Sequence, residues 1–243
     1  MVKEERVMNI LITGAGTGLG LHMARALSNE GMNVICISKE FEDESSTDYV
    51  TFSGDIFDDE FINKTFDCIS REIGNIDVLI NNIGYGSNSV FDNGDYDEFL
   101  KMFRLNVKSQ YRLFKMCVEK NNIKKVINIS SAYSKVTFPT LELYAATKKA
   151  SLELTRNLSE KYKNISFACI CPGYMIHKKH IKYFSTKEGR KFLKYRIPLK
   201  RVGNPTKELI PAILTCVRVI KNIRYIELFI DGGLSAYVGE MYD

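Results

Sequence analysis

Short runs rich in apolar and β-branched residues alternate along this chain with longer segments whose apolar residues recur at helical spacing. Such alternation is typical of an α/β fold, a parallel sheet covered by helices on both faces. No linker divides the 243 residues, so we expect one domain over 1–243. The predicted strands are residues 7–13, 33–38, 49–53, 78–81, 125–130, 165–170 and 225–230, and the predicted helices are about 18–30, 58–73, 96–121, 142–163 and 205–221.

The turn TGAGTGLG, residues 13 to 20, directly follows the first predicted strand and opens the first predicted helix. Glycines let the backbone turn tightly and approach a pyrophosphate, whose charge meets free N–H groups and the positive end of the helix. A glycine pattern alone also fits a structural turn. Its place after an N-terminal strand, within a strand–helix–strand unit, favours dinucleotide binding.

The stretch YAATK places Tyr144 and Lys148 four residues apart. On a helix these side chains share one face a single turn apart. The five residues alone also fit an exposed amphipathic helix. A free tyrosine, with a pKa of about 10, is a poor base near neutral pH, and a nearby cation would stabilise its phenolate. We therefore expect Lys148 to lower the pKa of Tyr144.

The spacing TGxxxGxG, together with YxxxK, resembles the short-chain dehydrogenase/reductase family, and the resemblance covers nearly the whole chain. Further matches in the family's order are Asp55 in SGDI, NNIG at 81–84 with isoleucine in place of the usual alanine, Asn106 in RLNVKS, Ser131 thirteen residues before Tyr144, CPG at 171–173 and IDGG at 230–233. This resemblance implies a Rossmann-type doubly wound sheet of about seven strands in the order 3-2-1-4-5-6-7.

The resemblance also implies an enzyme that transfers a hydride between a nicotinamide and a ketone or secondary alcohol. Tyr144 would be the general acid and base, and Lys148 would also hold the ribose hydroxyls of the nicotinamide. Ser131 would donate a hydrogen bond to the substrate oxygen. Asn106 would anchor a water that links Lys148 to solvent. The neighbouring Ser130 is a competitor for the catalytic serine, but the spacing to Tyr144 and strand alternation favour Ser131.

NADP(H) is favoured over NAD(H), because Ser38 and Lys39 end the second predicted strand, where an acidic residue would repel a 2′-phosphate. Glu40 and Thr17 weaken this preference, since many NADP-preferring relatives carry arginine at the position of Thr17. His177 replaces a threonine of the family, so it contacts cofactor, contacts substrate or lies on the surface. The predicted cofactor-binding residues are Gly14, Thr17, Gly18, Leu19, Gly20, Ser38, Lys39, Asp55, Ile56, Asn82, Gly84, Tyr144, Lys148, Pro172, Gly173, Met175 and His177.

Residues 178–207 contain eleven Lys or Arg and one acid, Glu188. They overlap an insertion at about 174–204, predicted to be irregular and to form a substrate lid. The charge fits a solvated surface, or a substrate that is anionic or linked to a carrier protein. Without a nucleic-acid recognition motif we expect no nucleic acid as partner. Candidates for an apolar pocket wall are Tyr133, Phe138, Tyr174, Tyr183 and Phe184.

Two alternative functions stay open at this level. The first is a 3-oxoacyl-carrier-protein reductase, and the second, from another class, is an NADP(H)-binding sensor or scaffold without turnover. No apolar run reaches the roughly 20 residues of a membrane span, and the first residues do not form a signal peptide, so we expect a cytoplasmic protein without membrane contact. The six cysteines form no metal-binding or disulfide pattern. The family resemblance further implies a homotetramer or homodimer, paired through helices 96–121 and 142–163 and the C-terminal segment.

Overall fold

The computed structural model describes residues 6–42, 47–87, 96–136, 138–218 and 223–236. They form a seven-stranded parallel sheet in the order β3-β2-β1-β4-β5-β6-β7, which confirms the predicted fold and strand order. The strands are β1 (Asn9–Thr13), β2 (Asn33–Ser38), β3 (Val50–Ser53), β4 (Val78–Asn81), β5 (Lys125–Ile129), β6 (Ser166–Pro172) and β7 (Tyr225–Ile230).

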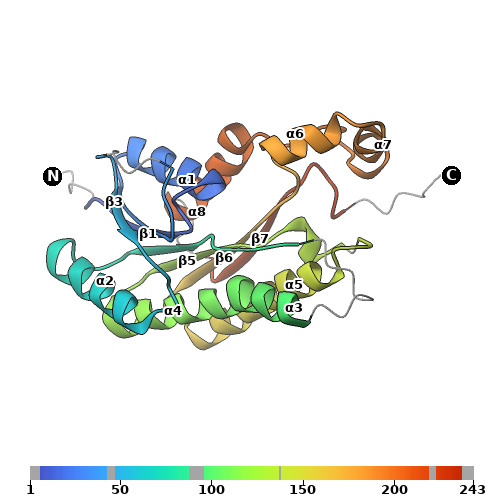
Figure 1. Ribbon diagram of the computed structural model, residues 1–243. Helices are drawn as coiled ribbons and strands as arrows, with labels where there is room; N and C mark the ends of the chain where they lie inside the picture. Colours follow the sequence, from blue (N-terminus) through green and yellow to red (C-terminus); the bar gives the residue numbers. More distant parts are fainter. Residues whose placement is uncertain (1–5, 43–46, 88–95, 137, 219–222, 237–243) are drawn as a thin grey trace.

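Helices cover both faces of this sheet (Figure 1). The helices α1 (Gly18–Asn29) and α8 (Ile210–Arg218) cover one face, and α2 (Asp59–Glu72), α3 (Tyr96–Phe103), α4 (Ser109–Lys120) and α5 (Glu142–Lys161) lie on the other. Successive side chains of a strand point to opposite faces. Accordingly, Ile10 and Ile12 of β1 are buried with α1 and α8, and Leu11 is buried with α2 and α4. Burial on both faces explains the nearly continuous apolar runs.

The parallel register brings the carboxyl ends of the central strands to one edge of the sheet. Asn81 at the end of β4 pairs with Asn128 of β5, and Ile129 pairs with Ile170 of β6. The segments that follow these strands therefore leave the sheet side by side. In open α/β sheets this edge is where ligands bind.

Two of the predicted helices contain a wider, π-helical turn, one in the middle of the helix and the other at its start. Residues Arg104–Lys108 form a π-helical segment between α3 and α4, and Pro205–Leu209 form another before α8. In the first of these, the N–H of Ser109 donates to the carbonyl of Arg104, five residues earlier. Such a widened turn is frequent at functional sites, and here it carries the fully buried Asn106. Positions 219–221 of the last predicted helix lie outside the described residues.

The prediction that the insertion at 174–204 is irregular is wrong. The insertion contains two helices, α6 (Lys178–Phe184) and α7 (Lys187–Arg196). The hydroxyl of Thr186 accepts a hydrogen bond from the N–H of Gly189 and so caps α7. Phe184 and Phe192 are buried in a small cluster with Ala132, which follows β5. These apolar contacts order the insertion against the rest of the domain, although its sequence is dominated by lysine and arginine. No helix among the described parts of the chain has the length and apolar character to cross a membrane.

Candidate active site

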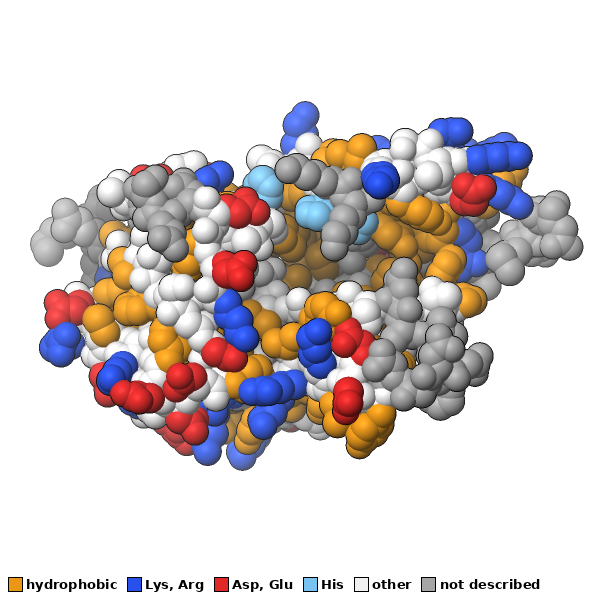
Figure 2. All heavy atoms as spheres, viewed as in Figure 1, with side chains coloured by type: hydrophobic (Ala, Val, Ile, Leu, Met, Phe, Trp, Pro, Cys, Tyr) orange, Lys and Arg blue, Asp and Glu red, His pale blue; other side chains and the backbone are white. Residues whose placement is uncertain are grey.

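A cavity of about 940 Å³ opens at the carboxyl edge of the sheet. Its walls come from the start of α1, from the segments after β4, β5 and β6, from the first two turns of α5, and from α6. Figure 2 shows a hollow with hydrophobic side chains in its interior and histidines along its rim. Of the predicted site residues, it is lined by Gly18, Leu19, Asn82, Gly84, Ser131, Tyr144, Lys148, Pro172, Gly173, Met175 and His177.

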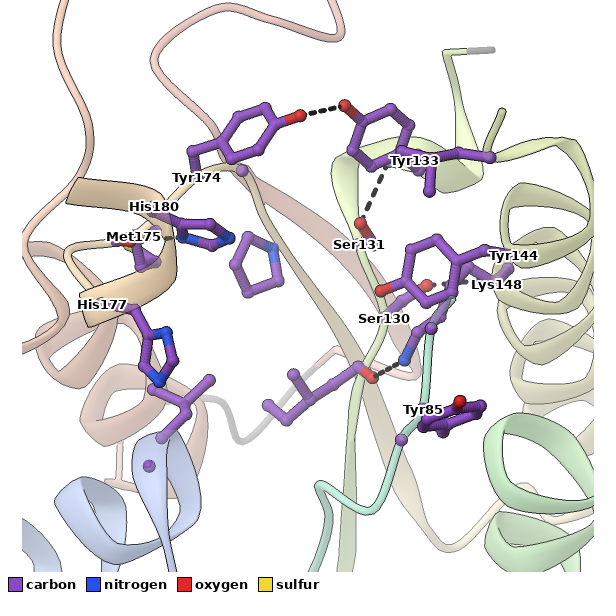
Figure 3. A pocket seen from close by; sticks show the side chains of 18 of the residues that line it. Tyr85, Ser130, Ser131, Tyr133, Tyr144, Lys148, Tyr174, Met175, His177 and His180 are labelled. Atoms are coloured by element: carbon purple, nitrogen blue, oxygen red, sulfur yellow. Dashed lines mark hydrogen bonds between the residues drawn. The ribbon is translucent and has the colours of Figure 1, made fainter. Parts of the chain in front are cut away.

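Helix α5 presents Tyr144 and Lys148 to this cavity from one face, and Ser131, just after β5, lies beside Tyr144 on the same wall (Figure 3). The Nζ atom of Lys148 is 5.7 Å from the centre of the Tyr144 ring. It also donates a hydrogen bond to the carbonyl of Ile129 over 3.1 Å. Lys148 is buried and Tyr144 is half-buried, so the pair stands at the base of the cavity.

Burial dominates the electrostatics of this pair. It raises the pKa of Tyr144 above the usual value, and a hydrogen bond with Ser131 acts in the opposite direction. The expectation that Lys148 sets a lowered pKa for Tyr144 is therefore wrong for the protein alone, because removal of the phenolate from water outweighs the stabilising contacts. Burial also lowers the pKa of Lys148 to about 8. The lysine thus keeps most of its charge at neutral pH.

Ser130 and Ser131 both line the cavity, but their hydroxyls have different partners. The Ser130 hydroxyl donates to the backbone carbonyl of Lys148 over 3.2 Å. The Ser131 hydroxyl is hydrogen-bonded with Tyr144 and accepts from the N–H of Tyr133. Of the two serines, Ser131 is therefore the one whose hydroxyl lies close to the hydroxyl of Tyr144.

Asn106 lies behind this wall and is fully buried. Its Oδ1 atom accepts from the N–H of Tyr85, and its Nδ2 atom donates to the carbonyl of Tyr85 and to the hydroxyl of Thr147, each over 2.8 Å. It thus ties the segment after β4 to α5. A Cβ atom on Gly84 would lie 3.1 Å from the Nζ of Lys148 and 3.2 Å from the Oδ1 of Asn106, so both polar atoms face the same glycine.

The glycine-rich turn fits the pyrophosphate of a dinucleotide. Gly14 and Gly18 have φ angles of 62° and 53°, which other residues rarely adopt. A Cβ on Gly20 would stand 2.0 Å from the carbonyl oxygen of Gly14, so only glycine permits this close approach. Asn82 supports the turn by donating to the carbonyls of Thr13 and Gly14.

Thr17 occupies the N-cap position of α1, but its side chain makes no capping hydrogen bond. The first N–H groups of the helix therefore keep their donor capacity at the cavity, where Gly18 and Leu19 line the wall. Together with the glycine cradle, this arrangement fits a bound nicotinamide dinucleotide.

The predicted adenosine-binding residues lie at the ends of β2 and β3, beside the glycine turn. A Cβ on Gly16 would stand 2.8 Å from the Oγ of Ser38. Lys39 forms an ion pair with Asp55, with 2.9 Å between Nζ and Oδ2. Although partial burial acts to raise it, the pKa of Asp55 is lowered by the N–H of Phe57 and by Lys39. The adjacent Ile56 is buried.

The cavity-lining residues that sequence reasoning missed include three with polar side chains: His22, Tyr85 and His180. His22 stands four positions after Gly18 on α1, a helical spacing that could have placed it on the same face. His180 lies on α6, which was expected to be irregular, so no periodicity pointed to it. Its Nδ1 atom is 2.7 Å from the carbonyl oxygen of Met175.

The basic residues of the insertion whose side chains the structure describes do not line the cavity. Among the described residues that line it, Lys148 is the one Lys or Arg, and none is Asp or Glu. Lys182, Lys187, Arg190 and Lys191 are exposed on α6 and α7. All six cysteines are free. Within the described ranges, no group of three or more His, Cys, Asp or Glu is placed to hold a metal ion.

Comparison with known proteins identifies the family. The sequence profile described as short chain dehydrogenase matches residues 8–187. The chain is 26% identical to 3beta-hydroxysteroid dehydrogenase 1 of Eggerthella lenta over 255 residues, which cover 98% of both chains. The chain therefore belongs to the short-chain dehydrogenase family, and it is an NAD(P)-dependent oxidoreductase of that family.

Solved structures agree in fold. A gluconate 5-dehydrogenase from Burkholderia cenocepacia, in complex with NADP and tartrate, superposes with a TM-score of 0.83 at 25% identity, covering 95% of this chain and 96% of that one. A 4-hydroxyisoleucine dehydrogenase in complex with NADH gives a TM-score of 0.85 at 22% identity over 95% and 99% of the two chains. Structures similar to this chain thus hold either NADP or NADH.

Proposed function

We propose that this protein is an NADP(H)-dependent oxidoreductase that interconverts a ketone and a secondary alcohol, with Tyr144 as general acid and base. The observation that carries the proposal is the placement of Ser131, Tyr144 and Lys148 on one cavity wall, next to a glycine turn that fits a dinucleotide. A bound nicotinamide cofactor supplies or accepts the hydride.

The chain's own residues donate the proton in reduction and remove it in oxidation. In reduction, the phenol of Tyr144 donates its proton to the substrate oxygen; in oxidation, the phenolate removes the proton of the alcohol. Ser131, already hydrogen-bonded with Tyr144, donates a hydrogen bond to the same oxygen and holds it beside the tyrosine. The ammonium of Lys148 stabilises the phenolate that forms, and its remaining N–H donors are directed to the ribose hydroxyls of the cofactor.

Two further roles complete the proposal. Asn106 anchors a water between Lys148 and solvent, because its amide faces Gly84 beside the lysine ammonium. His177, an exposed residue of the cavity rim, contacts the cofactor together with Pro172, Gly173 and Met175. A sensor or scaffold without turnover would have no need of a serine, tyrosine and lysine on one wall. A 3-oxoacyl-carrier-protein reductase stays the alternative, supported by the exposed basic surface of α6 and α7 near the cavity.

Replacing Tyr144 with phenylalanine should reduce turnover to below a few per cent of the wild-type rate, because the proton donor is lost while the ring that packs in the wall is kept. Binding of NADPH, followed by its fluorescence, should stay within about twofold, because the glycine turn is untouched. Tyr195→Phe, at an exposed position of α7 that does not line the cavity, is the matched control and should retain full activity. A Tyr144→Phe enzyme with substantial turnover would exclude the proposed acid.

Lys148→Met should slow alcohol oxidation most at neutral pH. Below the Lys148 pKa of about 8 the wild-type ammonium stabilises the phenolate, and above it this stabilisation is lost. We therefore expect a deficit of about tenfold or more near pH 7 that shrinks toward pH 10, since one pKa unit corresponds to about 1.4 kcal/mol. The measurement is kcat against pH, with Lys149→Met, on the exposed side of α5, as control. A deficit that does not change with pH would contradict this role.

Lys39→Asp should reverse the cofactor preference. Lys39 and Ser38 can accept a 2′-phosphate, whereas an aspartate beside Asp55 would repel it. We expect the ratio of the Kd for NADP to the Kd for NAD to rise by at least about tenfold, measured by calorimetry. Lys64→Asp changes the same charge in an ion pair of α2 and should leave the ratio unaltered. An unchanged ratio in the Lys39 variant would show that this residue does not select the cofactor.

We also infer a homodimer or homotetramer paired through α3, α4 and α5. Large apolar side chains are exposed on the first two of these helices: Tyr96 (68%), Leu100 (45%), Phe103 (40%) and Tyr111 (48%). Light scattering should give a mass of two or four chains, and Leu100→Glu combined with Phe103→Glu should lower it. A monomeric wild-type protein would refute this assembly.

A further inference from the structure

The part of the cavity beyond Ser131 and Tyr144 is walled by aromatic side chains. The rings of Tyr133 and Tyr174 are 6.2 Å apart at nearly right angles, and the Tyr133 ring is 6.3 Å from that of Tyr144. Behind this wall, Tyr174 and Phe138 both pack on Phe192 of α7, with ring centres 5.5 and 5.3 Å away. The wall therefore belongs jointly to the segment after β5 and to the insertion.

Two hydroxyls meet within this aromatic lining. The hydroxyls of Tyr133 and Tyr174 are 2.5 Å apart, in a hydrogen bond that joins the two sides of the cavity (Figure 3). Each tyrosine hydroxyl has one proton and two lone pairs. The bond uses one proton and one lone pair, so the pair retains a second proton and several lone pairs for another oxygen.

His180 adds an acceptor on the same side. A carbonyl oxygen only accepts, so the Nδ1 atom of His180 carries the proton in its 2.7 Å contact with the oxygen of Met175. In the neutral ring the Nε2 atom is then an acceptor. The His180 ring packs edge-on against the Tyr174 ring, with centres 5.1 Å apart, so both rings belong to the same side of the cavity.

Near the tyrosine pair, the described part of the lining offers no cation for an anionic substrate group. Lys148, the one Lys or Arg among the described lining residues, stands at the base of the cavity beside Tyr144. A carboxylate or phosphate brought against the tyrosine pair would lose hydration without gaining a cation. A hydroxyl or carbonyl oxygen would instead exchange water for the tyrosine hydroxyls at little cost.

We propose that the Tyr133–Tyr174 hydroxyl pair is a specificity-determining subsite that binds a second, uncharged oxygen of the substrate. The substrate is then a largely apolar ketone or secondary alcohol whose second group is a hydroxyl or oxo oxygen rather than a carboxylate or phosphate. This inference rests on the proposed oxidoreductase function, and it gives that function a substrate class.

The test uses ketones that differ in a single group far from the reacting carbonyl. These are cyclohexanones with a methyl, hydroxyl or carboxylate group at position 4, and 2-decalones with the same groups at position 6. The comparison is made within the ring system that is reduced faster. There we expect kcat/KM with NADPH to be about tenfold higher for the hydroxyl than for the methyl compound, and lowest for the carboxylate.

Tyr133→Phe and Tyr174→Phe each remove one hydroxyl and keep the ring. Each should reduce the hydroxyl-to-methyl ratio of kcat/KM about tenfold, toward parity. Tyr195→Phe is the matched control, because Tyr195 is an exposed tyrosine of α7 that does not line the cavity. Its ratio should equal that of the wild type. Retained NADPH binding shows that each variant is folded.

The two proposals fail in different ways. If no ketone is reduced although NADPH binds, the proposed function is wrong. The subsite is then judged from the calorimetric Kd of 1,4-cyclohexanediol and of 4-methylcyclohexanol for the cofactor-loaded protein. If ketones are reduced, but the hydroxyl gives no preference or the phenylalanine variants leave the ratio unchanged, the subsite is refuted. A preference for the carboxylate would refute it in favour of an anionic substrate.

Discussion

The parallel pairing of seven strands, buried on both faces, is the constraint on which the rest of this structure depends. Because all strands run in one direction, the segments after β1, β4, β5 and β6 emerge at one edge. Residues as far apart in sequence as Gly18 and Tyr174 thereby line one cavity. Backbone hydrogen bonding between the strands sets their register, and helices packed on the apolar side chains of both faces keep the sheet out of water.

Sequence reasoning predicted the parts of the fold that depend on periodicity and on glycine. The strand order follows from motifs found in family order. The glycine turn is visible in the sequence because positive φ angles at Gly14 and Gly18 and the close approach at Gly20 favour glycine. The π-helical turn at Arg104–Lys108 could not be anticipated, since it widens a helix without breaking the apolar period. The helices of the insertion were missed because lysine and arginine masked a small apolar set around Phe184 and Phe192.

At the site, spacing identified which residues stand together but not their electrostatic state. Tyr144 and Lys148 lie on one helix face as their separation predicts. The pKa of the tyrosine depends on burial by elements distant in sequence, a quantity that no local pattern contains. The same holds for the basic insertion: its sequence shows the charge, and only the structure shows that Lys182, Arg190 and Lys191 are exposed and do not line the cavity.

Asn106 fastens three elements with one side chain. Its amide joins the segment after β4 to α5 through Tyr85 and Thr147, while its backbone belongs to the π-helical turn between α3 and α4. Loss of this amide would leave the segment after β4 and α5 without their common hydrogen-bonded partner. The wall that carries Tyr144 and Lys148 thus depends on a residue that does not itself line the cavity.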